Sequence, residues 1–374
     1  MKFSCTQENL NRGLGVVSHI AAKNANLPIL HNVLVSAQEG GIELTATNLE
    51  IGIRARVRGK VEEEGSFTVP AQVFANYVGL ISAERVDLEK KETNLFINAG
   101  NQNTKLRGEE ANEFPLIPDV EKNEPLTVLA TELKEALGQT LVAASHDDSR
   151  PELTGVLFHV KDNQIILAST DSYRLAERKL LLPKKVEKER SIIIPAAALS
   201  ELVRVFTDNE EEEVQIYFSD SQALFVTPEV EITTRLIEGS FPDYEQIIPQ
   251  EERTTVIIDK DALVKAVKAA SLFSKSGIHD VNIHFSPEKQ EVTLTTVNNQ
   301  LGENVSKVEA EIKGDSNNII FNYRYLLDGA SQIPTKKTRI VLVDNTSPGV
   351  FRPHGNEDEE TGEVYSYIIM PIKQ

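Results

Sequence analysis

Three stretches of the chain follow one pattern: LVSAQEGGIELTATN at residues 34–48, LFHVKDNQIILASTD at 157–171 and IHFSPEKQEVTLTTV at 283–297. Each stretch reads as an apolar strand, a turn built from glycine, asparagine, aspartate, proline or lysine, and a second strand that carries a threonine near its end. These threonines are 123 and 126 residues apart: Thr47, Thr170 and Thr296. The spacing predicts three copies of one hairpin along the chain.

Two further landmarks recur with nearly the same period. A short strand stops at a helix-starting residue and an amphipathic run follows, at Pro70, Pro195 and Asn322. Proline suits this place because the first N–H groups of a helix have no intrahelical partner. A Phe-Pro pair occurs at 114–115 and again at 241–242, which is 127 residues later. We therefore predict three similar domains, at residues 1–124, 125–250 and 251–374.

Each predicted domain contains the same elements in the same order. An early helix is expected at 7–23, 131–145 and 259–275, and a second helix at 71–83, 196–207 and 322–337. The hairpin and other short alternating strands, roughly eight in all per domain, lie around them. The fold class is therefore α+β, with two helices packed on antiparallel sheets in each domain. On one predicted strand Arg54, Arg56 and Arg58 alternate with apolar residues, so we expect them on a solvated face.

The composition describes a folded chain of 374 residues. Apolar residues make up 40%, which excludes an intrinsically disordered protein, and no stretch approaches the ~20 apolar residues of a membrane helix. The N-terminal residues lack the apolar core of a signal peptide. The single cysteine, Cys5, excludes an internal disulfide and a thiolate metal site. We expect a cytoplasmic protein without membrane contact.

The charge is acidic overall but unevenly distributed. The chain has 57 acidic and 39 basic side chains, a net charge of −18, whereas the six predicted helices together carry +4 and the remainder −22. A hole lined by these helices would suit a polyanion. The alternative is that the exposed helix faces are simply rich in lysine.

Neither end of the chain reads as a polar cap. Residues 364–370 are apolar and strand-like, unlike the polar cap that ends a solenoid. Because open strand edges invite uncontrolled pairing, we expect one chain's end to pair with another chain's start in a closed, symmetric ring of two chains.

Catalytic signatures do not accompany this architecture. Gly13 and Gly15 form a lone G-x-G without the remainder of a nucleotide-binding motif, and the seven histidines show no metal-ligand spacing. The sequence therefore predicts a binding protein with no catalytic residues, no metal and no cofactor.

Short motifs along the whole chain carry a family resemblance: Lys2-Phe3, Leu27-Pro-Ile-Leu30, Thr47-Asn-Leu-Glu50, Thr170-Asp-Ser-Tyr-Arg-Leu175, Phe241-Pro-Asp-Tyr244 and Met370-Pro-Ile372. Together they resemble the bacterial DNA polymerase III β subunit family, the sliding clamps. The resemblance implies three DNA-clamp domains per chain and a head-to-tail homodimeric ring around double-stranded DNA. Such a processivity factor tethers the replicative polymerase and catalyses nothing itself. The implied partners are the DNA polymerase III α subunit, an ATP-driven clamp loader, and other clamp-binding polymerases and repair proteins.

The resemblance also implies three sets of site residues. A peptide-binding pocket between the second and third domains would use Leu153, Thr170, Ser172, Tyr173, Arg174, Leu175, Pro242, Ile247, Asn322, Tyr325, Thr346, Pro348, Met370, Pro371 and Ile372. The basic helix residues that would face DNA are Arg12, Lys23, Lys134, Arg204, Lys260, Lys265, Lys268 and Lys275. The subunit interface would join Thr104 and Leu106 of one chain to Leu272 and Phe273 of the other. For the apolar members of these sets, ordinary core packing is the competing interpretation.

Two alternatives of other classes remain at this point. One is a carboxylate-dependent metal hydrolase that uses Asp147, Asp148 and Asp171, although these residues have no recognised ligand spacing. The other is a scaffold that binds peptides and never encircles DNA. Retention on circular compared with linear DNA separates the scaffold from a topological tether.

Overall fold

The computed structural model describes residues 1–21, 27–275, 277–355 and 364–373. These residues form two compact units, which we call the first unit (1–130 with 205–236) and the second unit (131–204 with 237–374). The middle third of the chain therefore contributes to both units. Within the described ranges, no helix is long and apolar enough to cross a membrane.

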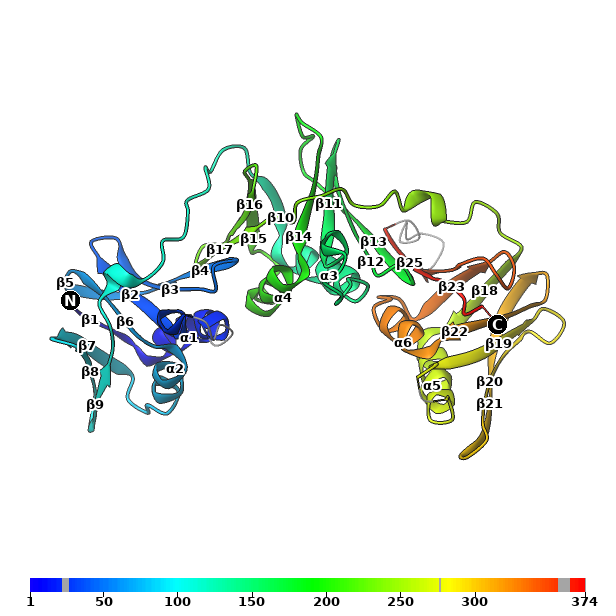
Figure 1. Cartoon of the computed structure of the whole chain (residues 1–374), viewed down its shortest axis with the longest axis horizontal. Coiled ribbons are helices and arrows are strands. Elements are labelled where there is room, and N and C mark those ends of the chain that lie inside the picture. The colour runs from blue at the N-terminus through cyan, green and yellow to red at the C-terminus, as the bar shows by residue number, and fades with distance from the viewer. Residues whose placement is uncertain (22–26, 276, 356–363, 374) are drawn as a thin grey trace. The chain divides into compact units, whose positions relative to one another are not determined.

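Among the residues that the structure describes, each third of the chain contains two α-helices (Figure 1). Their bounds are α1 (Gln7–Ala21), α2 (Ala71–Gly79), α3 (Ala130–Leu141), α4 (Ala196–Val205), α5 (Lys260–Ser271) and α6 (Tyr323–Ser331). Four short 3₁₀ helices accompany them: η1 (Pro28–His31), η2 (Ala111–Glu113), η3 (Pro151–Leu153) and η4 (Glu245–Ile247). The prediction of paired helices is confirmed, and the five helices from α2 to α6 end earlier than expected. The last turns tighten: Leu80 N donates to Tyr77 O (3.0 Å) and Gln332 N donates to Gly329 O (3.1 Å).

The first unit contains two antiparallel sheets. The five-stranded sheet has the order β5-β1-β7-β8-β9 and the eight-stranded sheet the order β10-β15-β16-β17-β4-β3-β2-β6. The strands of the five-stranded sheet are β5 (Gly59–Glu63), β1 (Lys2–Thr6), β7 (Arg85–Lys91), β8 (Asn94–Ala99) and β9 (Gln102–Arg107). Those of the eight-stranded sheet are β10 (Leu126–Leu129), β15 (Glu213–Phe218), β16 (Gln222–Val226), β17 (Val230–Arg235), β4 (Ile51–Val57), β3 (Gly41–Thr47), β2 (Asn32–Gln38) and β6 (Gly65–Pro70).

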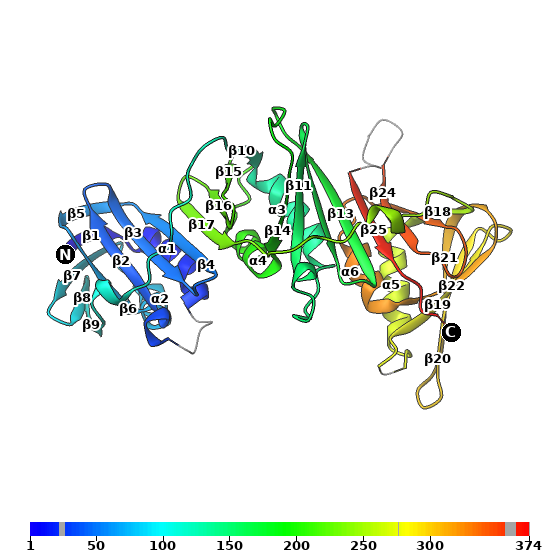
Figure 2. The ribbon, with the colours of Figure 1, turned by 45° about the horizontal axis from the view of Figure 1, so that its top comes forward.

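The second unit is built on one twelve-stranded sheet of order β14-β11-β12-β13-β25-β24-β23-β18-β21-β20-β19-β22. Its strands are β14 (Arg190–Pro195), β11 (Gly155–Lys161), β12 (Gln164–Thr170), β13 (Arg174–Leu181), β25 (Tyr365–Ile369), β24 (Gly349–His354), β23 (Lys337–Leu342), β18 (Thr254–Asp259), β21 (Gly302–Gly314), β20 (Glu291–Asn298), β19 (Asp280–Ser286) and β22 (Asn317–Asn322). Both views show β20 and β21 as a long hairpin (Figure 2).

The three predicted hairpins form β2–β3, β11–β12 and β19–β20. Consecutive repeats are then joined by main-chain pairing. In the first unit β4 pairs with β17, with Ile51 opposite Thr234. In the second unit β13 pairs with β25, with Arg174 opposite Ile369. We call these two pairings the first junction and the second junction.

The prediction that the terminal strands are free edges is wrong. β25 lies between β13 and β24, and β1 lies between β5 and β7, so both are hydrogen-bonded on two sides. The apolar character of residues 365–369 reflects complete burial inside the sheet. In the sheets of the described residues, the edge strands are β5, β9, β10, β6, β14 and β22.

The prediction of a solvated face for Arg54 is also wrong. Its side chain is 27% exposed, pairs with Asp119 (3.1 Å) and donates to Ile117 O (3.1 Å). Arg56 and Arg58 remain largely exposed. Arg54 thus fastens the connecting segment after Pro115 onto β4.

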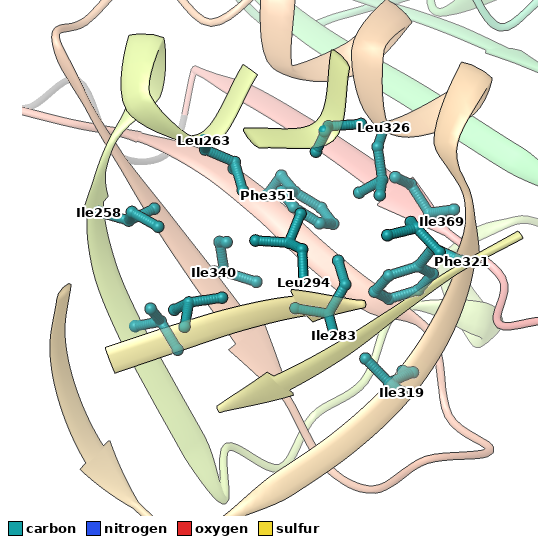
Figure 3. Packing of buried hydrophobic residues seen from close by; sticks show 14 of the residues in the cluster. Ile258, Leu263, Ile283, Leu294, Ile319, Phe321, Leu326, Ile340, Phe351 and Ile369 are labelled. Carbon is teal, nitrogen blue, oxygen red and sulfur yellow. The ribbon is translucent and has the colours of Figure 1, made fainter. Parts of the chain in front are cut away.

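The C-terminal core lies between α5, α6 and the strands around them (Figure 3). Phe321, Phe351 and Leu326 are buried in it, and the rings of Phe321 and Phe351 pack edge to face with 6.1 Å between their centroids. Tyr367 from β25 reaches α6 at Gly329, where an added Cβ would stand 2.0 Å from the tyrosine ring. The absence of a side chain there lets the helix lie directly on the strand that forms the second junction.

Candidate functional site

A tight turn precedes the first strand of the second junction. Thr170 Oγ1 donates to Arg174 O (2.7 Å) and accepts from Ser172 N (3.1 Å). Asp171 Oδ1 accepts from the backbone N–H groups of Tyr173 (2.9 Å) and Arg174 (3.0 Å). Ser172 is left-handed, with φ of 76°, a conformation that costs side-chain-bearing residues free energy. These hydrogen bonds hold the turn and present Tyr173 outward, with 62% of the residue exposed.

The Arg174 guanidinium lies beneath this turn and is paired on two sides. Nε donates to Asp171 Oδ2 (3.0 Å), the opposite end of the fork pairs with Asp328 of α6, and the Arg174 side chain is only 9% exposed. Burial lowers the pKa of Arg174, but Tyr367, Asp328 and Asp171 together raise it above its ordinary value. The guanidinium therefore stays charged and serves to hold the turn against α6.

Two tyrosines form an aromatic surface above Arg174. The rings of Tyr173 and Tyr325 stack at 6.4 Å with an interplanar angle of 22°, and the Arg174 guanidinium carbon lies 4.5 Å from the centre of the Tyr325 ring. Burial raises the pKa of Tyr325, so the ring is neutral at physiological pH. Stacked rings over a fixed cation give a flat, rigid contact surface at small entropic cost.

The C-terminal residues run beside this surface. Met370 N donates to Tyr173 O (2.9 Å), and Ile372 N donates to Ile320 O of β22 (2.8 Å). Met370, Pro371 and Ile372 are all half-buried. Contacts thus bring six of the predicted pocket residues into one cluster: Thr170, Ser172, Tyr173, Arg174, Tyr325 and Met370.

The other predicted pocket residues have more varied surroundings. Leu153 and Leu175 are buried, at 2% and 0% exposure. Pro242 and Pro348 are half-buried, Ile247 and Thr346 are exposed, and Asn322 caps α6 by accepting from Arg324 N (2.9 Å).

Sequence reasoning placed Asp171 only in the metal-hydrolase alternative, and it missed two residues that reach the cluster from other elements. Asp328 pairs with Arg174, and the Tyr367 hydroxyl donates to Tyr325 O (3.0 Å). Neither has a local sequence signal, because each reaches the site only through packing of α6 on β25.

Two of the three carboxylates of the metal-hydrolase alternative, those of Asp147 and Asp171, are engaged in turns. Asp147 Oδ1 accepts from Ser149 N (2.9 Å), and hydrogen bonding to the Ser149 backbone and hydroxyl lowers the pKa of Asp147. Asp171 is bound to Arg174 as described above. Across the described ranges, no three His, Cys, Asp or Glu side chains are grouped to hold a metal ion.

The predicted DNA-facing residues occupy the helices in different states. Lys265, Lys268 and Lys275 are exposed on or just after α5. Lys260 donates to Ile333 O (3.1 Å), Arg12 pairs with Glu229 (2.7 Å) and Arg204 pairs with Glu201 (2.9 Å). Lys134 is half-buried on α3, and Lys23 lies outside the described residues.

The predicted interface residues lie on accessible features of separate units. Thr104 and Leu106 are half-buried on β9, an edge strand of the first unit. In the second unit Leu272, which is 71% exposed, and the half-buried Phe273 follow α5.

Comparison with known proteins accounts for the whole chain. Family models of the DNA polymerase III beta subunit match it in three consecutive pieces: the N-terminal domain at 1–118, the central domain at 127–243 and the C-terminal domain at 245–373. The beta sliding clamp of Synechococcus elongatus is 31% identical over all of this chain and 99% of its own length, and that of Staphylococcus aureus is 28% identical with the same coverage.

Solved structures agree with this assignment. The DNA polymerase sliding clamp of Bacillus subtilis has a TM-score of 0.93 at 26% identity, covering 100% of this chain and 99% of that one. The Pseudomonas aeruginosa clamp bound to griselimycin also has a TM-score of 0.93 at 26% identity, with both chains fully covered.

The fold is thus that of a sliding clamp, made of three clamp domains that mix helices with antiparallel sheets. The chain belongs to the DNA polymerase III beta subunit family. This membership confirms the prediction from sequence of a non-catalytic DNA sliding clamp that acts in replication.

We predict that Asp171 determines the order of the turn. Asp171→Ala removes the acceptor for two backbone N–H groups and one partner of Arg174, so we expect at least tenfold faster amide hydrogen exchange at Tyr173 and Arg174, corresponding to about 1.5–3 kcal/mol. Asp171→Asn retains a carbonyl acceptor at the same place and should preserve most of the protection. Equal protection in Asp171→Ala and the unchanged chain would contradict this role.

Proposed function

We propose that two copies of this chain close head to tail into a ring around double-stranded DNA. The ring tethers the DNA polymerase III α subunit, and in turn other polymerases and repair proteins, through the surface around Tyr173 and Tyr325. The observation that carries this proposal is the stacked tyrosine pair, with Tyr173 exposed and Tyr325 half-buried against Arg174, in a chain that matches sliding clamps over its entire length. A clamp loader would open and close the ring. The working compartment is the cytoplasm, and the domain limits at 124 and 250 belong to the same proposal.

Enclosure explains why the sequence carries positive charge without base-reading motifs. Contacts to base edges fix a register, whereas phosphate contacts do not. Exposed lysines such as Lys265 and Lys268 can hold a duplex diffusely and let it slide. The net charge of −18 would repel DNA from the remainder of the surface. A closed ring is retained by topology, so weak contacts are sufficient.

The peptide site would work by shape and apolar contact. Arg174 pairs with Asp171 through Nε and with Asp328 through Nη1, so its role is to fix the aromatic surface beside the peptide. The half-buried Met370 supplies an adaptable side chain beside the tyrosines. Such a surface suits a short linear segment that ends in leucine and phenylalanine.

Topological retention is the direct test of the proposed function. After loading onto nicked circular DNA, the chain should remain bound through gel filtration at 0.5 M salt, about the range where phosphate contacts fail. Linearising the same DNA should release it within minutes, because a ring slides off free ends. Equal retention on circular and linear DNA would show groove binding and contradict enclosure.

The peptide site makes a separate prediction. Tyr325→Ala removes the ring that supports Tyr173, so binding of a fluorescent peptide ending in Leu-Phe should weaken about 10-fold to 100-fold, as for an aromatic hot spot. Leu181→Ala is the matched control, since Leu181 is 73% exposed at the other end of β13. Retention on circular DNA should be unchanged in both variants. Equal peptide affinity in the two variants would place the site elsewhere.

A further inference from the structure

We propose that the first junction holds a second ligand site, for a linear peptide that presents an aliphatic side chain next to a carboxylate. The inference rests on the proposed function of the second junction, because it begins from the likeness of the two. All residues that form this second site belong to the first unit.

The turn at the first junction reproduces the turn at the second. Thr47 Oγ1 donates to Ile51 O (2.9 Å) and accepts from Leu49 N (3.0 Å). Asn48 Oδ1 accepts from Glu50 N (3.0 Å) and Ile51 N (2.8 Å). Leu49 has φ of 76°, the value found at Ser172. Each bond has its counterpart 123 residues later, so the backbone of the two turns is the same.

The strand beside the turn also continues in the same way at the two junctions. Arg235 N donates to Glu50 O (3.1 Å), as Met370 N donates to Tyr173 O (2.9 Å). Arg235 therefore occupies the place that Met370 has at the second junction. Arg235 directly follows Thr234, which pairs with Ile51, as Met370 follows Ile369, which pairs with Arg174.

The segments that connect the domains are fastened at matching positions. Arg54 of β4 donates to Ile117 O (3.1 Å). At the second junction Glu177, which is 123 residues further along, accepts from the Tyr244 hydroxyl (2.6 Å). Both connecting segments thus pass over the strand that follows the turn, and each forms one wall of its junction.

A cavity of about 170 Å³ lies at the first junction between the turn, residues 115–118 and β16–β17. Ile51 and Gly52 contribute to its lining, and a Cβ on Gly52 would stand 2.6 Å from Ile117, so glycine permits this close approach. Leu116 is 95% exposed beside the cavity. Apolar residues of the turn and of residues 115–118 line one part of the cavity, and the polar Glu50, Gln222 and Arg235 line the remainder. The apolar part and the size of the cavity suit one aliphatic side chain.

The rim of this cavity carries charged side chains where the second junction has its two tyrosines. Arg235 is exposed, and in the described part of the chain its guanidinium makes no ion pair. Its charge complements a carboxylate that follows the aliphatic side chain. Glu50, also exposed, stands where the second junction has Tyr173, so an aromatic peptide loses its stacking partner here. The two junctions would accordingly select different peptides on one backbone.

The test measures binding of two fluorescent hexapeptides to the full chain in low salt. One peptide has a central Leu-Asp and the other ends in Leu-Phe, and the chain is titrated up to about 1 mM. The Leu-Asp peptide should bind, and its affinity should be unchanged by Tyr325→Ala. Arg235→Met, which installs the residue of the second junction, should weaken it about tenfold. Glu50→Gln should strengthen it severalfold by removing a like charge. A peptide with Leu-Asn in place of Leu-Asp should bind the unchanged chain as weakly as the Leu-Asp peptide binds Arg235→Met.

The Leu-Phe peptide separates this inference from the proposed function. Its affinity should fall with Tyr325→Ala and stay constant with Arg235→Met. If the Leu-Asp peptide fails to bind, or its affinity ignores Arg235→Met, the second site is overturned while the Leu-Phe result stands. If only the Leu-Phe peptide fails, the proposed function is the part that is contradicted.

Discussion

The architecture depends on main-chain hydrogen bonding between strands of neighbouring repeats. β4 with β17 and β13 with β25 each extend one repeat's sheet into the next, so the backbone groups at the join are satisfied without water. Register is strongly specified there because a one-residue slip would exchange buried and exposed faces. This pairing fixes where each turn lies relative to the strand beside it. A repeat joined only by side chains would not hold the turn, the connecting segment and the adjoining strand in one place.

The same backbone carries different chemistry at the two junctions. At the second junction the Arg174 side chain is held between Asp171 and Asp328 and is only 9% exposed. At the first junction the equivalent residue is the apolar Ile51, and charge appears instead on the exposed Glu50 and Arg235. Duplication thus preserved the hydrogen-bonded frame while the side chains on it diverged.

The sequence was sufficient to predict the triplication, the hairpins and the paired helices, because spacing and periodicity survive where identities do not. The sequence was insufficient where pairing between residues far apart in the chain determines how a residue is buried. Residues 365–369 read as an open strand, yet β25 is enclosed on both sides. Arg54 read as a solvated residue, yet it fastens a connecting segment. Asp328 and Tyr367 reach the site through packing of α6, which has no local signature. Thr170 was predicted from the hairpin spacing and, as a pocket residue, from the family resemblance, whereas Asp171 was named only in the metal-hydrolase alternative.

Engineered disulfides across the two junctions test the shared register most directly. Glu177 lies opposite Ser366 and, at the equivalent place, Arg54 lies opposite Glu231. Cysteines at directly opposed positions fall within the roughly 4.4–6.8 Å Cα separation that a disulfide requires. The account predicts rapid, near-complete oxidation of both the Glu177→Cys/Ser366→Cys and the Arg54→Cys/Glu231→Cys variants, and little in pairs shifted by one residue. Crosslinking at only one junction, or preferentially in the shifted pairs, would contradict a common register and with it the common frame of the two sites.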